Sequence, residues 1–576
     1  MTRQSIGKRR KTSPAPTSPG PGEGASLAPE SSAPSEGPRR TRFPLAALGA
    51  LAASLIVYLL RLDRVFGLIV DDAWYVMLAK ALATGHGYTL INSPTPGITP
   101  FYSPGFPALL SIFYRLSPNF PNNIYLLKSV SIAAMMGVGA LGYLYFKRFR
   151  GLPDYVSLGI SLATVIYPAI VFLATSAVMS EPVFMCAQLG AIVLIERCVR
   201  DGGSGAQVRW IALGGAVAAF AFLTRPAGVG LLAAGAIYLV KERLIKQAAI
   251  FAAVVALLVG PWMLYSRSHA PTPAQQAEQG ANIVQPYTKQ LWQRTAGQPL
   301  SGTISAGEMP ERIWNNLSEI GRYDFGGLVF YSLYRPLEPG EPIRIPSEAR
   351  MISLALMLLA LAGYILTLRE RLTVVELVVP FSIGVSCLWG WEQYRLLLPL
   401  APFLFYYLLM GVRGIARLYR KLHTNADPRR ESPAVVVFAW LLVLFNLYGN
   451  AQYIQKKNDP QPEYRLRWIS AFEENLDLIN HIGANIPKED VIATQNPALV
   501  HLFTGHKTVA SDDPAGSWET WNRIGVRYLA RTSPLPLPKS DPAETGFRTV
   551  YRANGALNLR LIDLGPPSSR PVWGRN

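Results

Sequence analysis

The sequence has 576 residues, of which 50% are hydrophobic and only 16% are charged. With a mean hydropathy of +0.20, this composition excludes an ordinary soluble multi-domain enzyme of the same length. Lys and Arg outnumber Asp and Glu by 55 to 37, which gives a formal net charge of +18. The three cysteines lie within apolar runs and the six histidines are scattered, so the sequence predicts neither a disulfide framework nor a Cys/His zinc site.

The N-terminal segment, residues 1–42, is rich in Pro, Ser and Gly and carries eight Lys and Arg residues. Such a composition cannot bury a hydrophobic core, so we predict a disordered basic tail. The apolar run at 43–62 is long enough to cross a bilayer, and the polar segment before it is too long for a removable signal peptide. We therefore predict a retained membrane anchor.

Ten further apolar runs follow, and a membrane span needs about 20 such residues. The sequence thus predicts an α-helical polytopic membrane protein with about eleven transmembrane helices, the body of which covers residues 43–450. The runs lie at 43–62, 129–146, 153–174, 182–199, 208–223, 226–240, 247–265, 351–368, 372–390, 396–412 and 433–449.

The region 208–240 holds two short apolar runs separated by Thr224, Arg225 and Pro226. One continuous helix here would reverse every later loop and place the basic segment 413–430 on the side that is otherwise poor in Lys and Arg. We therefore predict two helices, either as two spans or as a re-entrant pair.

Basic and non-basic connections alternate along the chain. Those on one side hold 25 Lys and Arg and those on the other hold six, leaving aside the long 266–350 segment. Cytoplasmic loops carry the excess of positive charge, so we predict a cytoplasmic tail and an extracytoplasmic C-terminus. The outer side then receives the loops 63–123 and 266–350 and the polar region 451–576. This last region mixes a helical pattern at 467–482 with short β-type runs at 491–494 and 526–529, which predicts a small α/β domain.

The outer loop 63–123 contains the acidic pair Asp71 and Asp72. Apolar residues then recur at helical spacing from 74 to 82, which predicts an amphipathic helix lying on the membrane surface. A Pro-rich loop at 92–107 and a second apolar helix ending near Leu116 follow. We expect this stiff loop to wall a cavity at the boundary between lipid and water.

Ionisable residues gather at helix ends on the predicted outer side: Asp71 and Asp72, Glu181, Arg225 and Arg395. Each has a purely structural alternative, because aspartate caps helices, glutamate before proline begins them, and arginine snorkels to the membrane interface. Their combination favours a functional site, since membrane proteins rarely keep such groups at helix ends on this side without a function.

Carboxylates and arginines around one cavity suit a reaction with a phosphate leaving group. A carboxylate takes a proton from an acceptor hydroxyl, and cations neutralise the departing phosphate. The sequence has no Gly-rich phosphate loop and no nucleotide-binding fingerprint, which argues against a soluble nucleotide. A phospholipid-like carrier fits a membrane cavity better.

At these residues the chain resembles the GT-C superfamily of integral-membrane glycosyltransferases, in particular the branch with aminoarabinose transferases, protein O-mannosyltransferases and RgtA/B/C/D-like enzymes. The D[DE]xxY pattern of that family is matched by Asp71 to Tyr75, and its Pro-rich segment by Tyr102 to Pro107. The segments 179–182, 223–226 and 394–399 are similar to later family landmarks, in the same order. The resemblance covers about 43–450, and 451–576 looks like the extracytoplasmic domain that many members carry.

The resemblance implies transfer of a single sugar, with inversion, from a polyprenyl-phosphate donor to a lipid, glycan or protein acceptor at the extracytoplasmic face. It implies a mannosyltransferase-like hexosyl- or pentosyltransferase, with membrane lipids and no nucleic acid among its partners. The basic tail and the retained anchor favour a bacterial plasma membrane over an organelle. Asp71 would be the general base for the acceptor hydroxyl, and Asp72 would orient or assist it. The candidate substrate-binding residues are Glu181, Arg225, Tyr394, Arg395, Tyr102 and His86.

Two departures from the family pattern matter. The second acidic residue is Asp72 rather than Glu, and the Lys-Pro-Pro of the aminoarabinose branch is replaced by Tyr102, Ser103 and Pro104, which removes a candidate phosphate-binding lysine. No organic cofactor is implied. Use of Mg²⁺ or Mn²⁺ stays an open alternative, because Asp71, Asp72 and Glu181 can supply hard oxygen ligands.

Two rival functions stay open. A polymerase or ligase of lipid-linked oligosaccharides would depend on arginines rather than on Asp71, and would transfer whole blocks of sugars. A transporter or flippase would place charges near the middle of the bilayer and show repeat symmetry; the sequence shows neither.

Overall fold

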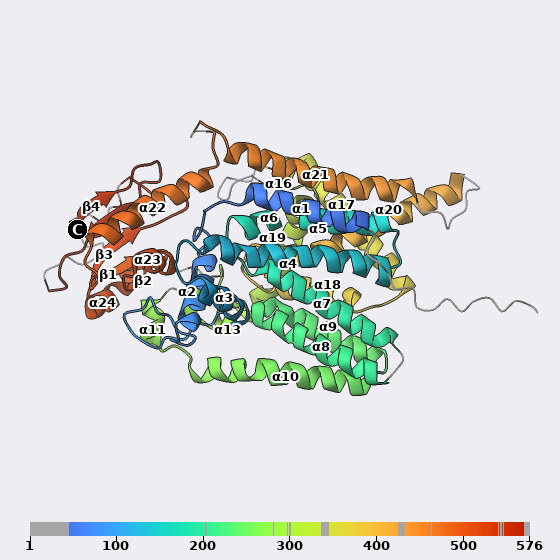
Figure 1. The fold of residues 1–576 in the computed structure, drawn as a ribbon, viewed down its shortest axis with the longest axis horizontal. Coiled ribbons are helices and arrows are strands. Elements are labelled where there is room, and N and C mark those ends of the chain that lie inside the picture. Colours follow the sequence, from blue (N-terminus) through green and yellow to red (C-terminus); the bar gives the residue numbers. More distant parts are fainter. Residues whose placement is uncertain are drawn as a thin grey trace, which may run out of the picture. The chain divides into compact units, whose positions relative to one another are not determined.

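The computed structural model describes residues 45–201, 204–279, 281–296, 298, 301–335, 345–423, 432–461, 464–539, 541, 544 and 546–568. The predicted tail, residues 1–42, lies outside these ranges. Helices dominate the described residues, and a small sheet with its own helices forms near the C-terminus (Figure 1). The fold class is therefore the predicted one, an α-helical membrane protein with a small C-terminal α/β part.

Each of the eleven predicted apolar runs forms a helix or a bent helix pair. They are α1 (Leu45–Arg61), α4 (Ile124–Leu144) extended by η1 (Tyr145–Phe149), α5 (Asp154–Val165) with α6 (Pro168–Thr175), α7 (Glu181–Arg200), α8 (Ser204–Thr224), α9 (Val229–Lys241), α10 (Ile245–Ser268), α17 (Ser347–Glu370), α18 (Val375–Cys387), α20 (Ala401–His423) and α21 (Pro433–Lys457).

Seven of the helices in the described ranges are long and apolar enough to cross a membrane. The pair α5 and α6, bent by 50°, makes an eighth candidate, whereas α1, α9 and α18 are shorter apolar helices. The chain is therefore a multi-pass membrane protein, and the figure of eleven crossings stays a prediction.

The helical conformation is interrupted at Arg225, between α8 and α9. Arg225 is extended, with φ −147° and ψ 129°, and the short turn η2 (Pro226–Gly228) follows it. Proline disfavours helical backbone at the residue before it, which explains the break. Gly215 of α8 lies against the Phe251 carbonyl of α10, and Gly235 of α9 lies against the Phe251 ring. The two helices therefore fold back on each other, and the two-helix prediction for 208–240 is confirmed.

Connections that the charge pattern assigned to one side lie together. Arg200, at the end of α7, donates to the carbonyls of Arg148 and Phe149 at 2.8 and 2.7 Å. Arg150 pairs with Glu376 of α18 at 2.8 Å. The loops after α4 and α7 and the loop before α18 therefore share one end of the bundle, as alternating spans require.

The loop 63–123, which is predicted to be an outer loop, contains α2 (Asp71–Ala83) and α3 (Gly105–Leu116), at the predicted positions. The place of α2 at the membrane surface stays a prediction, but the helix is covered by protein over most of its length. Nine of its thirteen residues are buried. They include Asp72, Tyr75, Ala79 and Ala81. The reason is tertiary packing: α3 packs on one part of α2, and the C-terminal helix α23 (Pro497–Thr504) packs on another. The local pattern of apolar residues does not reveal that other helices bury α2.

The C-terminal region forms a five-stranded sheet in the order β2-β1-β3-β5-β4. Strands β2, β1 and β3 are parallel, and β3, β5 and β4 are antiparallel. Trp518, Trp521 and Val509 lie in its hydrophobic core. The elements are α22 (Arg467–Asn485), β1 (Val491–Thr494), α23, β2 (Thr508–Ala510), α24 (Pro514–Ile524), β3 (Val526–Arg531), β4 (Arg548–Arg552) and β5 (Arg560–Asp563).

The segment 266–350, the second predicted outer loop, consists mostly of short helices. A further short helix, α19 (Gln393–Leu397), and the turn η6 (Leu398–Leu400) precede α20. The short elements of the segment are α11 (Pro273–Glu278), α12 (Ala281–Val284), α13 (Tyr287–Gln290), η4 (Ala306–Glu308), α14 (Met309–Glu319), η5 (Ile320–Asp324), α15 (Phe325–Val329) and α16 (Tyr331–Tyr334).

Candidate active site

Four of the predicted charged residues come together from separate parts of the sequence. They form one connected series of ion pairs. Arg395 donates from Nη2 to Asp71 Oδ2 at 2.9 Å and from Nε to Glu181 Oε1 at 2.5 Å. Arg225 Nη1 lies 2.9 Å from the same Glu181 oxygen. Glu181 is therefore shared by two arginines, and one of them also binds Asp71.

Each of these four side chains lies at a helix end, at an interruption between two helices or in a short helix. Glu181 begins α7, where unpaired backbone N–H groups favour a carboxylate, and a proline follows it in the first turn. Arg225 occupies the break between α8 and α9. Arg395 lies in the short helix α19, before the proline-containing turn η6. Asp71 opens α2 directly after Val70, whose φ is +70°.

The cluster is closed around Glu181 and open at Asp71. The exposed fraction of the Glu181 side chain is 1% and that of Arg225 is 14%, whereas Asp71 keeps 28% and Arg395 keeps 32%. Two carboxylates and two guanidinium groups also give a formal charge of zero. The buried Glu181 charge is therefore compensated by direct ion pairs, and Asp71 is the more exposed of the two carboxylates.

Tyrosine side chains line the cluster. Tyr102 donates to Asp71 Oδ1 at 2.6 Å, and its ring centroid lies 5.5 Å from that of Tyr75. Burial and the neighbouring Asp71 charge raise the pKa of Tyr102 well above its usual value, so its hydroxyl keeps the proton that it donates. Ser180 links the groups, because it donates to the Tyr75 hydroxyl at 3.2 Å and accepts from Arg225 at 3.0 Å.

Asp72 lies outside the ion-pair cluster. Its side chain is fully buried and accepts from the backbone N–H groups of Gly67 at 2.8 Å and Ala73 at 3.1 Å. Burial raises the pKa of Asp72 to about 6. The structure thus gives the two adjacent aspartates different surroundings: Asp71 meets the arginines, and Asp72 holds the turn before α2.

Two other predicted residues also lie apart from the cluster. His86 is exposed and bonds to Thr84 Oγ1 at 2.8 Å, just after the end of α2. Tyr394 is buried beneath the Arg335 guanidinium, whose central carbon lies 3.9 Å from the ring centroid. The Tyr394 hydroxyl bonds to that of Tyr167.

Arg335 is the main residue of this region that the sequence did not suggest. It pairs with Glu392 at 2.6 Å and with the buried Asp324. The charge comparison set aside the 266–350 loop in which Arg335 lies. The available signal was an arginine directly after a tyrosine at the end of that loop.

The three carboxylates that could supply oxygen ligands to a metal, Asp71, Asp72 and Glu181, do not gather at one point in the described residues. In the part of the chain that the structure describes, no three His, Cys, Asp or Glu side chains gather as a metal site. Asp72 faces the Gly67 backbone, while Asp71 and Glu181 already bind guanidinium groups.

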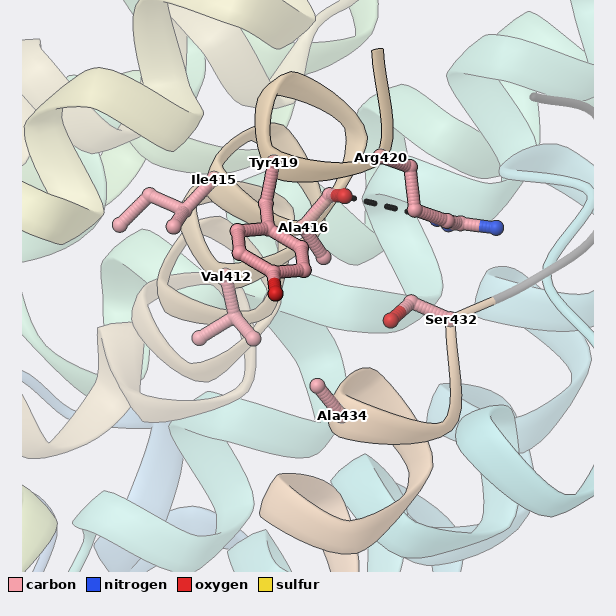
Figure 2. A pocket seen from close by; sticks show the side chains of 7 residues that line it. All are labelled: Val412, Ile415, Ala416, Tyr419, Arg420, Ser432 and Ala434. Atoms are coloured by element: carbon pink, nitrogen blue, oxygen red, sulfur yellow. Dashed lines mark hydrogen bonds between the residues drawn. The ribbon is translucent and has the colours of Figure 1, made fainter. Parts of the chain in front are cut away.

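A cavity of about 380 Å³ lies elsewhere, between the end of α20 and the start of α21. Figure 2 shows its lining: five residues of α20, from Val412 to Arg420, together with Ser432 and Ala434. The lining is mostly apolar and includes none of the predicted site residues. It also lies at the opposite end of α20 from Arg395, which precedes that helix.

No family model matches the chain, and no curated protein matches its sequence. The oligosaccharyltransferase of Archaeoglobus fulgidus tethered with an acceptor peptide is 12% identical, with 87% of this chain and 69% of that chain covered and a TM-score of 0.50.

A second solved structure is ArnT from Cupriavidus metallidurans. In the apo state it is 14% identical, with 90% of this chain and 98% of that chain covered and a TM-score of 0.48. The structure of ArnT bound to undecaprenyl phosphate is 12% identical, with 92% of this chain and 99% of that chain covered and a TM-score of 0.46. At this level of identity, the likeness to the oligosaccharyltransferase is one of fold. The chain therefore shares the fold of this oligosaccharyltransferase.

Proposed function

We propose that the chain is a membrane glycosyltransferase that moves a single sugar from a polyprenyl-phosphate donor to an acceptor hydroxyl, with Asp71 as the general base. One observation carries the proposal. Asp71 is a partly exposed carboxylate, held by Tyr102 at 2.6 Å and Arg395 at 2.9 Å, at the open end of a cluster that also contains a second arginine. The fold shared with the oligosaccharyltransferase and the resemblance to the GT-C superfamily support the reaction class.

In the proposed reaction, Asp71 accepts the proton of the acceptor hydroxyl while that oxygen attacks the anomeric carbon of the donor sugar. A new C–O bond forms, and the bond from the anomeric carbon to the phosphate oxygen breaks. The electron pair leaves with the polyprenyl phosphate, and the configuration inverts. Arg395 and Arg225 neutralise the charge that develops on the phosphate. One base suffices, because a phosphate leaving group needs little general-acid help.

A lipid-linked donor suits the location of the cluster. Glu181 and Arg395 lie at the ends of helices that are long and apolar enough to cross a membrane, and Arg225 follows another. A phosphate at the head of a polyprenyl chain reaches this level while its chain stays in hydrocarbon. We place the reaction at the extracytoplasmic face of a bacterial plasma membrane, from the charge pattern of the loops.

We further propose that transfer needs no divalent cation. The support is the presence of two guanidinium groups, those of Arg395 and Arg225, in the same cluster as the proposed base. The arginines then supply the positive charge that a metal provides in other phosphate-leaving reactions.

The test is the variant Asp71→Asn, assayed in cells by the mass of the lipid or glycan product. Loss of a placed general base costs about 10²–10⁴ in rate, so we expect the increment of one hexose or pentose to disappear. The matched control is Asp201→Asn, which removes an aspartate paired with Arg197 near the other end of α7.

Two outcomes would contradict the proposal. An unchanged product with normal amounts of Asp71→Asn protein would remove Asp71 from the chemistry. An increment of several sugars in the wild type would favour a polymerase or ligase that transfers whole oligosaccharides.

A further inference from the structure

The segment before the proposed base has an unusual backbone. Val70 has φ +70° and ψ −53°, and the Asp71 N–H donates to the Ile69 carbonyl at 2.9 Å. This is a γ-turn with positive φ, a rare and strained conformation, and a β-branched residue at its centre is a true outlier. Such a turn persists only where the surrounding structure holds it.

The C-terminal domain contacts the chain at Gly67, directly before this turn. Asn496, the residue that caps α23, donates from Nδ2 to the Gly67 carbonyl, and both residues are buried. Gly67 has φ +83°, and a Cβ at this position would overlap the Leu499 side chain of α23. The Gly67 N–H in turn donates to Asp72 at 2.8 Å. A continuous set of contacts therefore runs from α23 through Gly67 to the residue beside Asp71.

The same domain also contacts the chain after α2. Thr508 of β2 donates from its backbone N–H to the Asn92 carbonyl at 2.8 Å, and Asn92 Nδ2 donates to the Thr508 carbonyl at 3.1 Å. Lys507 donates to the Ile91 carbonyl at 2.9 Å. Figure 1 shows α23 beside α2. The C-terminal domain thus fixes the chain on both sides of the helix that Asp71 opens.

We propose that the C-terminal domain positions the general base: Asn496 and Leu499 hold the strained turn at Val70 and thereby aim Asp71 at the substrate. This inference rests on the proposed role of Asp71. Asn496 is a positioning residue, since its amide bonds to Gly67, whose carbonyl also accepts from the Val70 N–H, and not to the ion-pair cluster.

The two ends of the Asn496 side chain allow a clean test. Oδ1 accepts from the Leu499 N–H at 3.2 Å and caps α23, whereas Nδ2 holds Gly67. Asn496→Asp keeps the helix cap, because aspartate caps as well as asparagine, but removes the donor to Gly67. The matched control is Asn475→Asp, which changes a buried asparagine whose Nδ2 bonds only within the C-terminal domain, to Ala471 and Ser533.

We expect Asn496→Asp to lower kcat by about 10- to 100-fold, the effect of a small misplacement of a catalytic group, with the donor KM within about twofold. Amide hydrogen exchange of a peptide spanning 65–76 should become faster in this variant. Asn475→Asp should change neither. Adding Val70→Gly to Asn496→Asp should restore at least about threefold in kcat, because glycine adopts positive φ without strain.

Wild-type kcat in Asn496→Asp, unchanged exchange at 65–76, or an equal loss in Asn475→Asp would each overturn the inference. Asp71→Asn, measured in parallel, separates the two proposals. If Asp71→Asn is inactive while Asn496→Asp is normal, the positioning role fails and the general base stands. If Asp71→Asn is fully active, the proposed function itself fails.

Discussion

Arg395 donates to Asp71 at 2.9 Å although 324 positions separate them along the chain. The same guanidinium also binds Glu181, 214 positions away, so a single side chain ties the first outer loop to the start of α7. A guanidinium has a planar fork of donors that serves two carboxylates at once, which one ammonium group does less well. This geometry gives Arg395 the central place in the candidate site.

Arg395→Lys should therefore lower kcat/KM by about 100-fold or more, because lysine loses the fork and one of the two ion pairs. The measurement is sugar transfer by purified enzyme at several donor concentrations. The control is Arg417→Lys, at an exposed arginine 3.5 Å from Glu370, which should stay within about twofold. Equal activity of both variants would contradict the assigned role of Arg395.

The adjacent aspartates should behave differently. Asp72→Asn keeps an oxygen that accepts from the Gly67 N–H and should reduce kcat by about tenfold or less, whereas Asp71→Asn should lose about 10²–10⁴. Steady-state rates of the two variants under the same conditions decide this. If Asp72→Asn is the more damaging change, the base has been assigned to the wrong aspartate.

Asp72 also predicts a pH dependence of stability. Its pKa in the folded state, raised by burial to about 6, lies above the usual 3.8. The stability that the protonated group contributes is complete below pH 3.8 and is lost as the pH rises through 6, by up to about 3 kcal/mol. Asp72→Asn lacks this loss, so its thermal stability relative to wild type should improve between pH 4 and pH 7. A pH-independent difference between the two proteins would count against a buried, shifted Asp72.

Chelation should leave transfer intact. We expect the wild type to keep more than about half of its activity in excess EDTA, because in the proposed reaction the guanidinium groups of Arg395 and Arg225 stabilise the leaving phosphate. The assay is sugar transfer before and after dialysis against EDTA. Loss of activity that Mg²⁺ or Mn²⁺ restores would show that a metal takes part.

The two ends of the bundle should face opposite sides of the membrane. In a variant without the three native cysteines, a cysteine at the exposed Gly97 should react with an impermeant reagent in intact cells. A cysteine at Leu422, which is 68% exposed, should react only after the cells are opened. Labelling of both positions from the same side would contradict the alternating topology.

Much of the fold was accessible from the sequence because membrane spans and helix breaks are local features. Each apolar run became a helix, since hydrocarbon demands that backbone groups bond within the segment. The break at Arg225 followed from the proline after it. The short strands at 491–494 and 526–529 also appeared where the β-type runs predicted them.

The sequence by itself thus determined the order of the apolar helices and the candidates Asp71, Glu181, Arg225 and Arg395 at their ends, because apolar runs, charges and helix ends are local features of a sequence. Tertiary structure alone decided that Asp71 meets Arg395 while Asp72 turns to Gly67, because adjacent residues at a helix start point in different directions. It also decided that α23 covers α2 and that Arg335 lies over Tyr394. These contacts join segments that are far apart in the sequence, and a local sequence pattern does not indicate which distant segment will pack against it.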